Sequence, residues 1–114
     1  MSRDLLLLLE NGFNDPERPG ELFVCPDCAP IEALLASDPS RNARLDIRRV
    51  PFARPRKAVI EVLGEARQGL PVLILGDEYA FPADAHTFGE TRYISDTRRI
   101  LELLAERHGF PKVH

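Results

Sequence analysis

The sequence is poor in cysteine and contains no long apolar run. Only two of its 114 residues are cysteine, and an N-terminal run of five leucines extends from Leu5 to Leu9. A signal peptide needs an apolar region of about 7–15 residues with a small-residue cleavage site, and a membrane span needs about 20 apolar residues. We therefore expect neither, and a location in the cytoplasm, where the two cysteines stay reduced and form at most a transient disulfide.

The chain also lacks an excess of positive charge. It has 15 basic and 18 acidic residues, which gives a formal net charge of −3. This balance predicts no nucleic-acid partner. Basic residues do cluster in the middle of the chain, and we interpret them as a solvated helix face: Arg48, Arg49, Arg54, Arg56 and Lys57.

Several common catalytic patterns are missing as well. There is no glycine-rich phosphate loop, no Ser/His/Asp order and no paired-carboxylate motif. Structural zinc needs four ligands, and two cysteines supply half of them. His86, His108 and His114 lie far from the cysteines in the sequence and have no ligand spacing to one another. We therefore expect no metal site within one chain, and a cluster shared between two chains stays open.

What the chain does contain is an alternation of apolar strand-like segments with amphipathic helix-like segments, which is typical of an α/β fold. Its length predicts a single domain over residues 1–114. Four strands are expected, in the order β-α-β-α-β-β-α with three helices: 4–9, 45–50, 70–75 and 91–94. The first two strands can pair in parallel through a right-handed crossover, and a hairpin would add the last two. Segments 11–20 and 80–90 are expected to be loops.

Proline and capping residues predict where the helices begin. The first helix is clearest over 31–36. Pro55 can open the second helix at its first position, where a missing N–H costs nothing. Ser95 can cap the last helix, and Asp96 suits its first turn.

The two cysteines form the motif Cys25-Pro26-Asp27-Cys28 directly before the first helix. A C-x-x-C beside a β-α-β pattern is typical of a redox pair, because the spacing holds two thiols within disulfide reach. The helix start adds backbone N–H donors and the positive end of the helix dipole. The sequence does not decide which residue caps this helix. If Cys25 is the cap, Pro30 lies far enough into the helix to break a hydrogen bond; if Asp27 is the cap, Pro30 lies in the first turn and is harmless.

This element order, with C-x-x-C ahead of the first helix and a proline opening the third strand, resembles the thioredoxin superfamily over nearly the whole chain. The resemblance implies a thioredoxin-like α/β sandwich with a mixed four-stranded sheet flanked by three helices. It implies that Cys25 is the accessible nucleophile and Cys28 the covered, resolving thiol. It also implies that Pro71 is cis and faces the cysteine pair, while Leu70 presents backbone groups to an extended substrate.

The resemblance extends to small-molecule binding. In glutathione-binding relatives, the start of the last helix holds the γ-glutamyl group on helix N–H donors, and here that position is Ser95 and Asp96. Both residues are therefore candidates for substrate binding, although capping already explains them. No cofactor is expected, and glutathione is an option that the resemblance adds. The expected partner is a protein or small-molecule thiol or disulfide, and the oligomeric state is not indicated.

Three departures from ordinary thioredoxins stand out. Fifteen residues separate Leu9 from Cys25, and this segment could form a lid over the site. Val24 stands where a tryptophan is usual. Asp27 lies inside the motif, and its negative charge disfavours a nearby thiolate.

A narrower resemblance is to an uncharacterised bacterial family known only as a domain of unknown function. It is carried by segments 23–37, 55–60 and 105–111, which contain F-x-C-x-x-C-A-x-I-E, P-R-x-A-V-I and A-E-R-H-G-F-P. The family supplies a fold and no established activity. Two functions are therefore expected: a thiol–disulfide oxidoreductase, or alternatively a non-catalytic interaction module on a thioredoxin fold, with a partner at the same groove or at segment 11–24.

Overall fold

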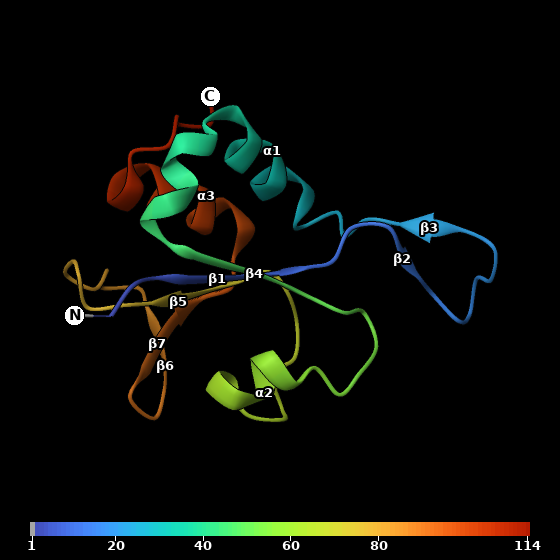
Figure 1. Cartoon of the computed structure of the whole chain (residues 1–114). Helices are drawn as coiled ribbons and strands as arrows, with labels where there is room; N and C mark the ends of the chain where they lie inside the picture. The colour runs from blue at the N-terminus through green and yellow to red at the C-terminus, as the bar shows by residue number, and fades with distance from the viewer. Residues whose placement is uncertain (1) are drawn as a thin grey trace.

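The computed structural model describes residues 2–114 and has a five-stranded mixed sheet with helices on both faces. Figure 1 shows α1 and α3 on one face of the sheet and α2 on the other. In chain order the elements are β1 (Leu5–Leu9), β2 (Phe13–Asn14), β3 (Leu22–Phe23), α1 (Ala29–Ser37), the 3₁₀ helix η1 (Pro39–Arg44), β4 (Asp46–Val50), α2 (Lys57–Leu63), β5 (Val72–Leu75), β6 (His86–Phe88), β7 (Thr91–Ile94) and α3 (Thr97–His108).

Strand β1 lies inside the sheet, whose order is β4-β1-β5-β7-β6. It pairs in parallel with β4, from Leu5 opposite Asp46 to Leu9 opposite Val50, and antiparallel with β5. β5 pairs antiparallel with β7, and β7 with β6. The predicted α/β class and the parallel pairing of the first two long strands are therefore confirmed.

The leucine run of β1 is explained by burial on both faces of the sheet. Leu6 and Leu8 belong to the core cluster that includes residues of α1 and α3, whereas Leu7 belongs to a second cluster with Val59 and Leu63 of α2. A strand covered on both sides has no polar face, so its sequence is continuously apolar. Packing on both faces therefore holds β1 in place within the sheet.

The sheet has five strands rather than the predicted four, because β6 forms in the segment that was expected to be a loop. All three side chains of β6 are exposed, so no hydrophobic alternation marks it in the sequence. Gly89, at φ +59°, makes the turn into β7. Segment 11–20 was likewise expected to be a loop, but it carries β2 and the turn of the two-stranded β2–β3 hairpin.

The helix starts differ from the predictions in detail. α2 begins at Lys57, with Arg56 as its cap, so Pro55 lies outside the helix. The cap of α3 is Asp96, whose carboxylate accepts a hydrogen bond from the Arg99 N–H at 2.9 Å, and Ser95 precedes the cap. The Asp96 carboxylate accepts from the free N–H groups at the helix start, and its negative charge is also favoured by the positive end of the helix dipole.

A buried ionic network ties the start of β1 to the end of α3. The Asp4 carboxylate accepts hydrogen bonds from Arg107 at 2.7 and 2.8 Å and from the Gly76 N–H at 2.7 Å, and His108 Nε2 lies 2.8 Å from it. Burial alone would raise the pKa of Asp4, but the hydrogen bonds from His108, Arg107 and Gly76 outweigh it and hold the pKa at about 2. This network therefore consists of charges that stabilise one another.

Candidate functional site

The cysteine pair lies at the start of α1, near the end of β1 that is opposite the Asp4 network. Cys28 is the cap residue of α1, and both thiols are free. The Cys28 N–H donates to Cys25 Sγ at 3.3 Å, and the Leu9 N–H at the end of β1 donates to Cys28 Sγ at 3.5 Å. Because Cys28 is the cap, Pro30 falls in the first turn and costs no hydrogen bond. Neither Cys25 nor Asp27 is the cap, which resolves the choice that the sequence left open.

The two thiols differ in accessibility. Cys25 is 8% exposed and Cys28 is 0% exposed, so both thiols are buried and Cys25 is the more exposed of the two. Burial raises the pKa of the Cys28 thiol to about 12, and the neighbouring Cys25 adds to this, whereas the Leu9 N–H opposes it. Burial therefore keeps Cys28 a neutral thiol at neutral pH.

Arg56 is a buried cation at this end of the molecule, and its placement corrects the interpretation of the basic cluster as a solvated helix face. Its side chain is anchored on carbonyl oxygens: Nε and Nη2 donate to Phe52 O at 3.0 and 2.8 Å, and Nη1 donates to Gln68 O at 3.0 Å. Burial lowers the pKa of Arg56, and the charge of Arg54 lowers it further, whereas Cys25 and Cys28 raise it.

The burial of Arg56 was not predicted from the sequence. A signal for it was available: Pro55 directly precedes Arg56, and the apolar stripe of α2 begins only at Ala58. A residue in that position caps the helix and does not lie along its face. The other members of the cluster are exposed, as expected, but they do not form a helix face: Arg48 and Arg49 lie on β4, Arg54 lies in the loop before α2, and Lys57 lies on α2.

The other predicted site residues are only partly brought together. Leu70, Pro71 and Ser95 line one hollow with a volume of about 400 Å³, and the Leu70–Pro71 peptide is cis as predicted. Leu70 packs against the core cluster that contains Cys25 and Cys28, although neither cysteine lines the hollow. Asp96 does not line it either, since its carboxylate is used as the cap of α3.

A hydrogen bond links the cysteine turn to α3. The Thr97 hydroxyl donates to the Asp27 carbonyl oxygen at 3.0 Å, so the starts of α1 and α3 are tied together. Asp27 itself is exposed. Thr97 was not predicted as a site residue, and only the fold brings it beside the C-x-x-C turn.

The segment between β1 and the cysteines forms the β2–β3 hairpin and projects from the body of the molecule (Figure 1). Its base is aromatic: the Phe13 ring stacks on Phe52 with centroids 4.4 Å apart, and Phe13 and Phe23 lie 6.0 Å apart. Val24, directly before Cys25, is 56% exposed, and Leu22 is 72% exposed. The segment that was expected to form a lid is therefore an arm that is anchored beside the cysteine pair and presents apolar side chains to solvent.

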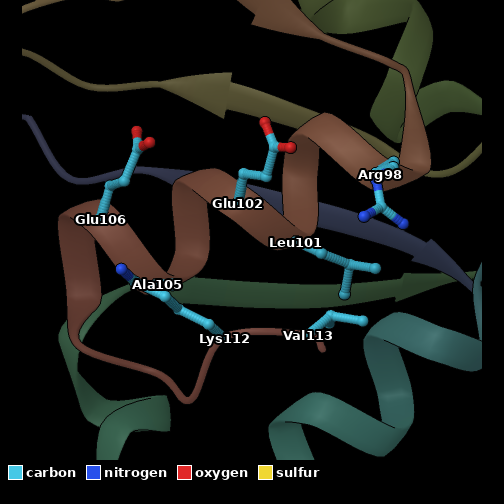
Figure 2. A pocket seen from close by; sticks show the side chains of 7 residues that line it. All are labelled: Arg98, Leu101, Glu102, Ala105, Glu106, Lys112 and Val113. Carbon is cyan, nitrogen blue, oxygen red and sulfur yellow. The ribbon is translucent and has the colours of Figure 1, made fainter.

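Figure 2 shows another hollow, of about 250 Å³, between the outer face of α3 and the C-terminal segment. Leu101 and Ala105 form its helical side, and Lys112 and Val113 close it from the C-terminal segment. No residue predicted from the sequence as a site residue lines it. It stands apart from the thiol chemistry considered above.

Within residues 2–114, no group of three or more His, Cys, Asp or Glu side chains is arranged so that it could hold a metal ion. No helix in the same part of the chain is long and apolar enough to cross a membrane.

Comparisons with known proteins place the chain in a family without assigning it an activity. No curated protein and no solved structure matches it. The model of one family, described as "Protein of unknown function (DUF3088)", matches residues 3–112, which is nearly the whole chain. The protein therefore belongs to this uncharacterised family.

Proposed function

We propose that this protein is a thiol–disulfide oxidoreductase on a thioredoxin-like fold, with Cys25 as the nucleophile and Cys28 as the resolving thiol. The observation that carries the proposal is the hydrogen bond from the Cys28 N–H to Cys25 Sγ at 3.3 Å. Such a donor favours negative charge on the sulfur that accepts it, as does a helix start. The buried cation of Arg56 supports the same charge.

The fold supports this proposal through the positions of its elements. The β1-α1-β4 unit has parallel strands, and β5 and β7 add antiparallel strands on the other side of β1. The cysteines lie between β1 and α1, and Leu70-Pro71 precedes β5, as the resemblance to thioredoxins implies. The edge strand β6 and the β2–β3 hairpin are additions to that pattern.

The proposed reaction consists of two thiol–disulfide exchanges. The Cys25 thiolate attacks one sulfur of a substrate disulfide, which forms a Cys25–substrate disulfide and releases one substrate thiolate. Cys28 then loses its proton to the released thiolate or to water and attacks Cys25 Sγ. The Cys25–Cys28 disulfide forms and the second substrate thiol leaves, so the substrate is reduced by two electrons and the protein is oxidised by two. An external dithiol returns the protein to its reduced form.

The roles of the two cysteines can be tested by counting thiols in a single turnover. The reduced protein is mixed with hydroxyethyl disulfide, and the released thiol and the protein mass are measured. We expect two thiols per chain and an intramolecular disulfide from the wild type. Cys28→Ser should release one thiol and retain the adduct on Cys25, whereas Cys25→Ser should release none. Equal release by both single variants, or none by the wild type, would contradict the proposed function.

A second candidate function is a non-catalytic interaction module, and the exposed hairpin favours it. Leu22 and Val24 are large apolar side chains that are exposed to solvent, and they lie just before the cysteines in the sequence. Exposed apolar side chains of this kind occur at protein-binding surfaces. If the wild type is inert towards disulfides, while Leu22→Ser abolishes capture of a partner protein, this function replaces the enzymatic one.

A further inference from the structure

The hollow lined by Leu70, Pro71 and Ser95 contains positive charge and no negative charge. Its lining includes the guanidinium groups of Arg54 and Arg67, and none of its lining residues is Asp or Glu. This is notable in a chain with a formal net charge of −3. The local field at the hollow therefore differs in sign from the net charge of the protein.

The two arginines of the hollow are not neutralised by carboxylates. Within residues 2–114 neither Arg54 nor Arg67 forms an ion pair, whereas Arg41, Arg49 and Arg99 each pair with an acidic side chain. The Arg67 guanidinium lies over the ring of Tyr93, 5.8 Å from its centroid, and Tyr93 also lines the hollow. This contact holds one of the two charges at the wall of the hollow.

The wall that carries Arg67 is fixed relative to the cysteine end of the molecule. The side-chain oxygen of Gln68 accepts a hydrogen bond from the Arg56 N–H at 2.9 Å, and its amide group donates to Glu65 O at 2.9 Å. The Gln68 carbonyl oxygen in turn accepts from Arg56 Nη1 at 3.0 Å. Gln68 therefore joins the turn after α2 to the buried Arg56, which is in turn anchored on the Phe52 carbonyl oxygen after β4.

We propose that this hollow binds the carboxylate of a small disulfide substrate, with Arg54 and Arg67 as its cationic ligands. Its volume of about 400 Å³ suits a small molecule, since such sites measure about 300–1,000 Å³. Planar guanidinium groups match carboxylate geometry, and the exposed Ser95 offers a further hydroxyl donor. Leu70 supplies apolar surface between the carboxylate and the core cluster that contains the cysteines.

This inference rests on the proposed function, because the bound molecule is the disulfide that Cys25 attacks. The electron balance is that of the exchange described above: Cys25 and Cys28 lose two electrons and two protons, and the substrate leaves as two carboxylate-bearing thiols. The arginines take no part in proton transfer. They raise the local concentration of the anionic substrate and orient it.

Three small disulfides of different charge provide the test: dithiodiglycolate is anionic, hydroxyethyl disulfide is neutral and cystamine is cationic. Each disulfide is mixed with the reduced wild type in a single turnover at low salt. The rate of this reaction is divided by the rate at which dithiothreitol reduces the same disulfide, which corrects for differences in intrinsic reactivity. We expect the anionic disulfide to react on the order of tenfold faster than the neutral one, because a cationic cleft concentrates anions. Cystamine should be the slowest, and added salt should reduce the differences.

Variants of the two arginines test whether the preference arises in this hollow. Arg54→Gln and Arg67→Gln should each lose most of the preference for dithiodiglycolate, measured within each variant as the ratio of its rate to the rate with hydroxyethyl disulfide. Arg54→Lys should restore part of the preference, because it keeps the charge. Arg44→Gln is the matched control, since it removes an exposed charge just before β4, level with the start of β1, and should keep the wild-type ratio.

The outcomes separate the two proposals. If none of the three disulfides reacts, the proposed function fails and this inference fails with it. If all three react at equal normalised rates, or if Arg44→Gln matches Arg54→Gln, the oxidoreductase stands and the carboxylate subsite is wrong. Retention of the full anionic preference in the Arg54→Gln/Arg67→Gln double variant also overturns the subsite.

Discussion

A buried arginine lies at each end of the sheet's central strands, and the two arginines have different partners. At the start of β1, Arg107 is paired with Asp4. At the opposite end of the strands, Arg56 is held by carbonyl oxygens of Phe52 and Gln68 and forms no ion pair within residues 2–114. A buried charge without a counter-charge is costly, and carbonyl oxygens return only part of that cost. The Arg107 end is therefore neutralised by an ion pair, whereas the Arg56 end, where β1 leads towards the cysteines, retains a positive charge.

The largest effect on stability is expected from breaking the buried ion pair between Asp4 and Arg107. Asp4→Asn leaves Arg107 buried without its counter-charge, and we expect the free energy of unfolding to fall by about 3–5 kcal/mol. Urea denaturation measures it. Asp46→Asn, at an exposed aspartate, is the matched control and should change stability little. A loss as small in Asp4→Asn as in Asp46→Asn would show that the ionic network does not stabilise the fold.

Removing the charge of Arg56 should change the reactivity of Cys25 as well as the stability of the fold. Arg56→Met removes the cation and leaves two carbonyl oxygens without their donors, which we expect to cost about 1–3 kcal/mol. The alkylation rate of Cys25 at neutral pH should fall, because a nearby cation no longer favours the thiolate. Arg56→Lys should retain part of the rate. A fall in stability without any change in alkylation would restrict Arg56 to a structural role.

The contribution of Asp4 to stability should be lost at acidic pH. The pKa of Asp4 is held at about 2 in the folded protein, below its usual value of 3.8. A lowered pKa stabilises the fold above the unfolded-state value, and this contribution of about 2 kcal/mol is lost as the pH falls from about 4 to about 2. Denaturation curves at a series of acidic pH values should show that loss in the wild type. The same series in Asp4→Asn should be flatter, and parallel curves would contradict the assignment.

The smallest effect is expected at the link between the cysteine turn and α3. Thr97→Val removes the hydrogen bond to the Asp27 carbonyl oxygen and should cost about 1 kcal/mol. Because the link orients the turn, hydrogen exchange at the Cys28 amide should quicken as well. Thr87→Val, on the exposed edge strand β6, is the control. Unchanged exchange in Thr97→Val would mean that the turn is held by α1 alone.

The sequence predicted the parts of the fold that leave a local signature. Continuous leucine marked β1, and the period of Ile100, Leu103 and Leu104 marked α3. It could not predict β6, because its exposed side chains carry no pattern and its pairing with β7 is a tertiary event. Likewise, Cys25 and Cys28 could be found from their spacing, but only the fold brings Thr97 to the cysteine turn and buries Arg56.

The hairpin arm has a consequence for how this protein can vary. The chain leaves β1 at Leu9 and returns to within 3.5 Å of it at the Cys28 sulfur. The intervening residues are thus an excursion whose two ends meet, and closing a longer or shorter loop of this kind changes the free energy of folding only slowly with length. The arm could therefore be resized or exchanged while the thiol geometry stays in place, so its length and sequence can vary independently of the positions of Cys25 and Cys28.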